Sequence, residues 1–147
     1  MTQSIRYFAP PKPGDIVWCR FPQEQSLQPA PKARPALVLR VGEIDGHPAA
    51  AIAYGTSHKL ERLFPGEFAI SPSDGAAYTT SGLSYPTKFN LARSVELPYN
   101  DRWFAVPPGA PFAQQPKLGV LHPALMQRAQ AAFSAAEPVV PTPEKQE

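Results

Sequence analysis

The chain alternates between short runs of apolar, β-branched or aromatic residues and segments rich in proline, glycine and polar residues. Runs of about four to eight such residues, bounded by turn-forming residues, are typical of β-strands. On this pattern we predict strands over residues 16–21, 36–41, 49–54, 67–70 and 86–92, and a further strand within 93–104. The pattern therefore favours a mainly β protein.

Two of these runs predict a β-hairpin. Residues 36–41 are nearly all apolar, which indicates a strand buried on both faces. Asp45-Gly46 follows, and this dipeptide is the strongest short-range signal for a hairpin turn. The turn returns the chain into residues 49–54, so we expect the two strands to be antiparallel neighbours.

The other predicted elements are short, except at the C-terminal end. We expect a helical turn over residues 59–63, a short helix capped by Ser73 that runs to Tyr78, and proline-rich turns over 107–116. His122-Pro123 opens the one strong helix, because proline is tolerated at the first helical position. The apolar residues of this helix recur at helical spacing, at Leu125, Ala129, Ala132, Phe133 and Ala136.

The proline content limits the architecture. The chain has 147 residues, enough for one domain, and 20 of them are proline, where average usage gives about 7. Prolines break helices and lack the hydrogen-bond donor that sheet interiors need. We therefore predict a flexible leader (1–12), one domain (13–136) and a disordered Pro-rich tail (137–147). The domain should be a small, strongly bent antiparallel sheet or open barrel of about five to seven strands, closed by a C-terminal α-helix.

The charge balance limits the kinds of partner that the chain can bind. Lys and Arg number 14 against 12 Asp and Glu, which gives a net charge of +2. Only 18% of residues are charged, so the chain is neither a strongly basic nucleic-acid coat nor a highly charged disordered protein. A polyanionic partner must therefore be held by a local cluster of cations.

Other sequence features exclude metal, disulfide and membrane chemistry. The single cysteine, Cys19, rules out an internal disulfide and a multi-cysteine metal site, and the histidines are scattered. We expect neither a metal nor a cofactor. No apolar stretch approaches the roughly 20 residues that span a bilayer, and the N-terminus does not resemble a signal peptide. We therefore expect a cytoplasmic protein with no membrane partner.

Basic and hydroxyl residues gather where the predicted hairpin begins and ends. The start of one antiparallel strand lies beside the end of the next, so Arg34 and Thr56 are expected at the same sheet edge. Close by in the sequence are Lys32, Ser57, His58 and Lys59. A guanidinium presents a planar fork that matches phosphate oxygens, and hydroxyls can bond the remaining oxygens. The cluster is suited to a phosphodiester, and the polar segment 22–32 is long enough to cover it.

Several motifs, taken in order, resemble the MazF/PemK-like toxins of bacterial type II toxin–antitoxin systems. They are Pro13-Gly14-Asp15-Ile16-Val17-Trp18, Lys32-Ala33-Arg34-Pro35-Ala36-Leu37-Val38-Leu39 and Ala53-Tyr54-Gly55-Thr56-Ser57. Three further segments follow in the expected order: Ser81-Gly82-Leu83, Pro86-Thr87 and Lys117-Leu118-Gly119-Val120-Leu121. The resemblance covers residues 13–136.

This resemblance implies an SH3-like barrel, usually a homodimer, that cleaves single-stranded RNA without a metal and is neutralised by a cognate antitoxin. It places Arg34 in the role of the catalytic arginine and Thr56 in that of the hydroxyl residue, with Ser57 as the alternative for the hydroxyl. The RNA 2′-hydroxyl would attack its own phosphodiester, Arg34 would stabilise the charged phosphorus and Thr56 would orient the phosphate. Four more side chains are predicted to bind RNA: Arg20, Lys32, His58 and Lys59. Outside the family pattern, His58 is also a candidate acid or base.

Two other function classes stay open. One is a catalytically inactive SH3-like module that binds RNA or a protein partner, including gyrase-type targets. The other is a structural or interaction domain unrelated to toxins. Single residues also have simpler interpretations: Arg34 as a strand-flanking surface residue, Thr56 and Ser57 as turn residues, Cys19 as packing, and Trp18 as a core or dimer contact that could stack on a base if exposed.

Overall fold

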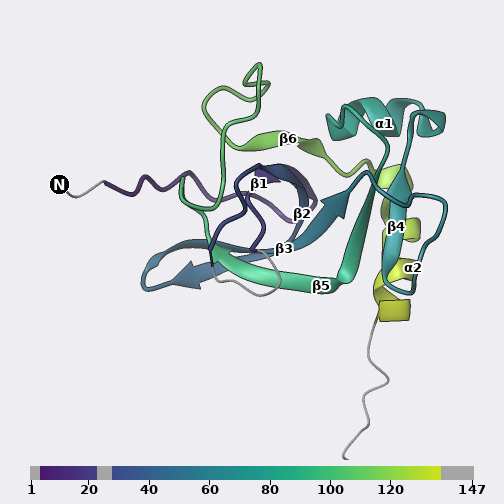
Figure 1. Cartoon of the computed structure of the whole chain (residues 1–147), viewed down its shortest axis with the longest axis horizontal. Coiled ribbons are helices and arrows are strands. Elements are labelled where there is room, and N and C mark those ends of the chain that lie inside the picture. The colour runs from purple at the N-terminus through teal and green to yellow at the C-terminus, as the bar shows by residue number, and fades with distance from the viewer. Residues whose placement is uncertain (1–3, 23–27, 137–147) are drawn as a thin grey trace, which may run out of the picture.

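Six antiparallel strands form one curved sheet in the computed structural model, which describes residues 4–22 and 28–136 (Figure 1). The strands are β1 (Asp15–Cys19), β2 (Arg34–Ile44), β3 (His47–Thr56), β4 (Glu67–Ile70), β5 (Thr87–Pro98) and β6 (Lys117–Val120), in the order β4-β5-β3-β2-β1-β6. The helical segments are η1 (Pro72–Asp74), α1 (Ala76–Ser81), η2 (Pro123–Leu125) and α2 (Met126–Ala136). The predicted mainly β class with a C-terminal helix is confirmed, and the predicted tail, 137–147, lies outside the described residues.

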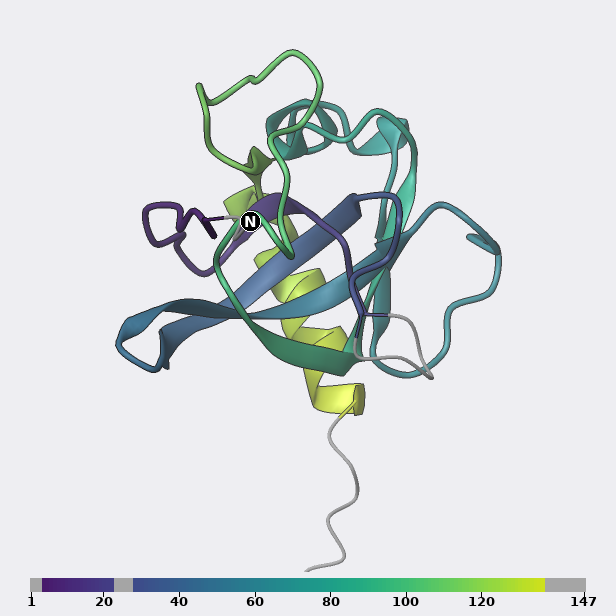
Figure 2. The same ribbon diagram turned by 60° about the vertical axis from the view of Figure 1, so that its left-hand side comes forward.

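Helix α2 and the β2–β3 hairpin lie at opposite ends of the molecule. Figure 1 shows α2 beside β4 at one end and the hairpin reaching out at the other. In Figure 2 the helix passes behind the curved strands, which agrees with its contacts to β4 and β5. The helix therefore covers one side of the sheet, including Leu37 of β2, and leaves the tip of the hairpin free of it.

The β2–β3 hairpin confirms the predicted turn. Asp45 and Gly46 both have positive φ, 53° and 81°, as a type I′ turn requires. Ile44 pairs with His47 directly across the turn. Both strands extend beyond their predicted bounds, so β2 begins at Arg34 itself.

Strand β5 corrects the prediction of two separate strands over 86–92 and 93–104. It is continuous, but its pairing with β3 jumps from Ala53↔Ser94 to Tyr54↔Asn90. The intervening residues bulge out, because the backbone N–H of Ala92 turns to the Asn90 side chain at 3.0 Å. The bulge bends the sheet and carries Arg93 out of the strand ladder.

The sheet is buried on both faces near its centre. Ile16, Leu37 and Ala53 belong to the cluster that includes residues of α1 and α2, whereas Val38 and Ile52 belong to a second cluster. Adjacent strand residues point to opposite faces, so the apolar run in β2 serves both clusters. The prediction of two-sided burial therefore holds over residues 36–38, whereas Arg40 and Val41 are exposed.

Three local predictions need correction. The helical turn predicted over residues 59–63 is shorter, since the Arg62 backbone N–H donates to the Lys59 carbonyl at 3.3 Å and Leu63 lies outside the turn. The N-cap of η1 is Ser71 and not Ser73, because the Asp74 carboxylate accepts the Ser71 backbone N–H at 2.9 Å. The C-terminal helix begins with the 3₁₀ turn η2, capped by His122, and Phe133, a member of its predicted apolar stripe, is 52% exposed.

The described part of the predicted leader, residues 4–12, packs on the curved sheet. Phe8 is buried in the second cluster, and its backbone N–H donates to the Tyr99 carbonyl at 3.0 Å. Tyr7 stacks on His47 at the hairpin tip, with ring centroids 4.2 Å apart. These contacts tie the segment before β1 to the end of the molecule that α2 leaves uncovered.

The second cluster also contains Cys19, which is fully buried. Burial raises the pKa of the Cys19 thiol, so the group stays protonated and serves as packing, as one sequence interpretation held.

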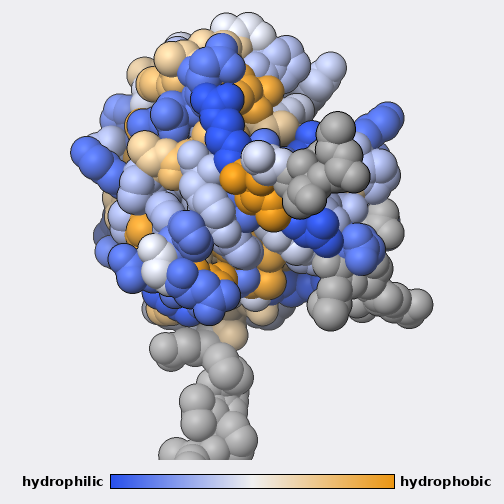
Figure 3. All heavy atoms as spheres, turned by 90° about the vertical axis from the view of Figure 1, so that its left-hand side faces the viewer, coloured by the Kyte–Doolittle hydropathy of each residue, from blue (hydrophilic) through white to orange (hydrophobic). Residues whose placement is uncertain are grey.

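On the face turned to the viewer in Figure 3, hydrophilic surface predominates and hydrophobic atoms form small separate areas. None of the described helices has both the length and the apolar character needed to cross a bilayer.

The ion pair between Asp74 and Arg128 predicts a stability that declines in acid. Arg128 donates to both carboxylate oxygens, at 3.0 and 3.2 Å, and holds the pKa of Asp74 below its usual value. A lowered folded-state pKa contributes stability above the unfolded pKa of about 3.9 and loses it as pH falls through the folded pKa. Asp74→Asn should therefore cost about 1 kcal/mol near pH 7, the scale of a partly exposed pair, and less near pH 3.

Urea unfolding of the two proteins at both pH values measures this difference. Glu61→Gln removes an exposed carboxylate that has no ion pair within residues 4–22 and 28–136, and is the matched control. A deficit of Asp74→Asn that grows in acid contradicts the prediction.

Candidate nucleic-acid interface

Strands β2 and β3 bring Arg34 and Thr56 to one end of the hairpin. Arg34 is the first residue of β2 and Thr56 the last of β3, and the ladder between them pairs Ala36 with Tyr54. A β-carbon on Gly55 would lie 2.6 Å from the Pro35 carbonyl oxygen, so only glycine allows this approach of the two strands. The predicted meeting of Arg34 and Thr56 at one sheet edge is confirmed.

Both side chains line one cavity of about 340 Å³, here called the central cavity. Ser57 and His58 line it as well, so four of the predicted site residues share one hollow. Its other walls include Trp18, Leu83, Tyr85 and the prolines of the segment between β5 and β6. The candidate interface is therefore a concave site with a cationic and hydroxyl-bearing side and an apolar side.

After their hydrogen bonds within the protein, Arg34 and Thr56 still have N–H and O–H groups that can donate to a ligand. Arg34 Nη1 donates to the Ala33 carbonyl at 3.3 Å, and Arg34 has no ion pair within the described part of the chain. Thr56 Oγ1 accepts the backbone N–H of His58 at 3.2 Å, which leaves its own O–H to donate elsewhere. An exposed guanidinium and a neighbouring hydroxyl donor can together bind the non-bridging oxygens of a phosphodiester.

Two further cavities adjoin the central one and add cations. The Lys32 cavity, about 450 Å³, is lined by Lys32, Arg34 and Arg93 beside the rings of Phe21 and Tyr54. The Lys59 cavity, about 430 Å³, shares Thr56 and His58 with the central cavity and adds Lys59 and Arg93, together with Lys88, whose charge is paired with Glu67 in the same cavity wall. The cations that a chain of net charge +2 would need for a polyanion are thus concentrated around one end of the hairpin.

Arg20 does not join this cluster. Its guanidinium donates to the Asp101 carbonyl at 3.2 Å, and it lines none of the three cavities. The chain after β1 runs along the 99–104 segment, where the Arg20 backbone N–H donates to the Trp103 carbonyl at 2.7 Å. The predicted role of Arg20 in RNA binding has no support from this geometry.

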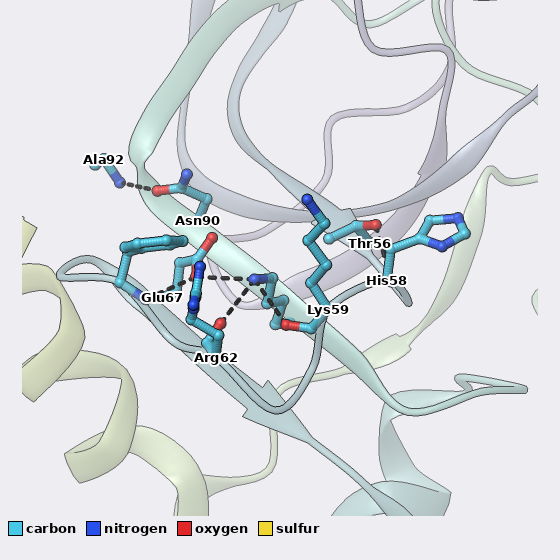
Figure 4. A network of polar contacts seen from close by, with 9 residues as sticks. Thr56, His58, Lys59, Arg62, Glu67, Asn90 and Ala92 are labelled. Carbon is cyan, nitrogen blue, oxygen red and sulfur yellow. Dashed lines mark hydrogen bonds and ion pairs between the residues drawn. The ribbon is translucent and has the colours of Figure 1, made fainter.

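A buried lysine holds the loop that follows Thr56. Lys88 Nζ donates to the carbonyls of Lys59 and Arg62 at 3.1 and 3.0 Å and pairs with Glu67 Oε1 at 3.0 Å. In Figure 4, the dashed lines that start at Lys59, Arg62 and Glu67 are these three contacts. The side chains of Lys88 and Glu67 are only 6% and 9% exposed, so the pair is shielded from water. This network positions the loop that carries Ser57, His58 and Lys59.

Sequence reasoning missed Arg93, Tyr85 and Lys88. Arg93 reaches two cavities only because β5 bulges after Asn90, and no local pattern marks that bulge. Tyr85 and Lys88 lie far from the hairpin in sequence and reach the site through pairing of β5 with β3. Within residues 4–22 and 28–136, no three His, Cys, Asp or Glu side chains gather in a way that could hold a metal ion.

Comparison with known families identifies the group to which this arrangement belongs. A family model described as PemK-like, MazF-like toxin of type II toxin-antitoxin system matches residues 12–135. The chain belongs to this family. The match confirms the resemblance drawn from the motifs between Pro13 and Leu121.

One solved structure similar to this PemK/MazF-like toxin is an endoribonuclease in complex with its cognate antitoxin from a mycobacterial species. The two chains are 18% identical, with a TM-score of 0.51, and the alignment covers 86% of this chain and 93% of that chain. At this identity the likeness establishes a shared fold. Among curated proteins, no sequence matches this chain.

The Lys88 network predicts a large loss of stability when its cation is removed. Lys88→Met leaves Glu67 buried without a counter-charge and two carbonyls without a donor, so it should lower the free energy of unfolding by about 3–5 kcal/mol. Lys88→Met combined with Glu67→Leu should recover part of this loss, because no charge is then left buried.

Urea unfolding of the single and double variants measures both effects. Lys59→Met removes an exposed lysine from the same loop and should change stability by no more than about 0.5 kcal/mol. A Lys88→Met variant as stable as the unaltered protein contradicts the role given to this network.

Proposed function

We propose that this PemK/MazF-like toxin cleaves single-stranded RNA by attack of the 2′-hydroxyl on the adjacent phosphodiester. The single observation that carries the proposal is that Arg34 and Thr56 line one open cavity within a cluster of cations. Membership of the toxin family and the fold shared with an endoribonuclease support the choice of RNA as substrate. We further propose that a cognate antitoxin neutralises the toxin, and that it acts in the cytoplasm as a homodimer.

The proposed reaction forms one bond to phosphorus and breaks another, and Arg34 stabilises the charge that develops in between. The 2′-oxygen loses its proton and forms a bond to phosphorus, the bond from phosphorus to the 5′-oxygen breaks, and the leaving oxygen takes up a proton. The products are a 2′,3′-cyclic phosphate and a 5′-hydroxyl. Arg34 stabilises the negative charge that builds on the phosphoryl oxygens, a contribution of about 2.7–4 kcal/mol per donor in comparable sites. In this scheme the guanidinium supplies the charge stabilisation and no metal is required.

Thr56 and His58 complete the proposed mechanism. The free O–H of Thr56 donates to a non-bridging oxygen and fixes the phosphate for in-line attack. The imidazole of His58 lines the same cavity and can take or give the transferred proton. Ser57 is the alternative to Thr56, since it lines the cavity from the next position of the chain.

Incubation of the purified chain with mixed-sequence RNA in the presence of EDTA tests the proposal. We expect discrete fragments with 2′,3′-cyclic phosphate ends. Arg34→Ala should slow their formation by roughly 10²–10³-fold because it removes the main charge-stabilising group. Thr56→Ala should also slow cleavage while Thr56→Ser retains it, and Ser57→Ala distinguishes the two hydroxyl candidates.

Arg40→Ala is the matched control. Arg40 is an exposed arginine of the same strand that lines none of the three cavities, so its loss should leave cleavage unchanged. Intact RNA that migrates slowly on a gel would contradict the enzyme and favour an inactive RNA-binding module. Cleavage that EDTA abolishes would contradict the metal-free scheme alone.

A further inference from the structure

Although Arg20 takes no part in the cluster around Arg34, it is one of three arginines that meet at Asp101. Arg6 belongs to the leader, Arg20 follows β1, and Arg102 lies in the segment after β5. The Arg6 backbone N–H donates to Asp101 Oδ1 at 3.1 Å, and the Arg20 guanidinium donates to the Asp101 carbonyl at 3.2 Å. Arg6, Arg20 and Arg102 are here called the arginine patch.

The guanidiniums of the arginine patch are held by neutral groups. That of Arg102 donates to Gln28 Oε1 at 3.3 Å and lies 5.5 Å from the centre of the Trp103 ring. That of Arg6 lies 6.0 Å from the centre of the Phe8 ring. Among residues 4–22 and 28–136, none of the three arginines forms an ion pair with a carboxylate. A guanidinium has five N–H donors, so each retains N–H groups that can bind an anion.

The arginine patch adjoins the Lys32 cavity. Cys19 pairs with Arg34 across β1 and β2, so Arg20 lies one residue beyond that pair. The Arg20 carbonyl accepts the Ala30 backbone N–H at 3.4 Å, and Ala30 lines the Lys32 cavity. The cations of the patch therefore follow directly on those that line this cavity.

Resting on the proposed function, we propose that the arginine patch binds the backbone of single-stranded RNA beyond the nucleotides held at the cleavage site. A row of cations that continues past the cavities matches a ligand whose negative charges repeat along its length, as those of a phosphodiester backbone do. Planar guanidiniums bind phosphate oxygens through paired N–H groups. Contacts to phosphates carry no sequence information, so the patch raises the affinity for long RNA without selecting a sequence.

Binding of 2′-O-methyl oligoribonucleotides, which cannot be cleaved by 2′-hydroxyl attack, tests the arginine patch. The strands are about 4 and about 16 nucleotides long, which spans the usual site sizes for single strands. Arg20→Gln combined with Arg102→Gln should weaken binding of the long strand on the order of tenfold at low salt and leave binding of the short strand unchanged. Its plot of log affinity against log salt should be shallower by about 1.4, since each phosphate contact contributes about 0.7.

Lys12→Gln combined with Arg40→Gln is the matched control. Lys12 and Arg40 are exposed, line none of the three cavities and lie outside the arginine patch, and their loss lowers the net charge by the same amount. This variant should bind both strands as the unaltered protein does. Arg20→Lys combined with Arg102→Lys keeps both charges and should retain most of the salt dependence.

The outcomes separate the arginine patch from the proposed enzyme. Weaker binding of the long strand by the double glutamine variant, in a protein that cleaves no RNA, would overturn the enzyme and support the patch. Equal binding of the long strand by this variant and the matched control would overturn the patch and leave the enzyme standing. If the variant then binds polyglutamate more weakly than the control does, an acidic protein segment would replace RNA as the ligand of this surface.

Discussion

The close contact between β2 and β3 at Gly55 is the constraint on which the candidate site depends. At this point the two strands and the Phe89 ring approach so closely that a β-carbon would lie within 2.8 Å of atoms on both sides. Because the strands meet there, the residues that flank the contact, Arg34 and Thr56, open into the same cavity. A larger residue at this position would push the strands apart and separate the guanidinium from the hydroxyl.

Within the described residues, the carboxylates that form ion pairs leave Arg34, Lys32, Lys59 and Arg93 without an ion-pair partner. Among residues 4–22 and 28–136, three carboxylates are paired away from Arg34: Glu67 with Lys88, Asp15 with Lys117 and Asp74 with Arg128. Each of these pairs also joins separate elements of the fold, and the Lys88 pair is the one shielded from water. The protein therefore has local positive potential at one site despite a net charge of only +2.

The sequence predicted the hairpin and the centre of the site because both depend on local signals. Asp45-Gly46 defines the turn, and the turn places Arg34 opposite Thr56. Strand β6 could not be predicted as such: it is short, contains Gly119 and is a strand only through pairing with β1, a segment about a hundred residues earlier. Arg93 was missed for a related reason, since its position follows from a bulge that tertiary pairing creates. The apolar stripe predicted from helical spacing includes Phe133, but Phe133 is exposed because the face of α2 that meets the sheet is narrower than this stripe.

The buried Cys19 has a practical consequence for observing this molecule at work. A thiol that remains protonated and enclosed in the core reacts slowly with maleimides and mild oxidants while the chain is folded. A second cysteine introduced at an exposed position would therefore be the one that a fluorophore or spin label modifies, with no need to replace the native residue first. Distances measured from such a label to an RNA strand or an inhibitory peptide would then report in real time when the central cavity is occupied.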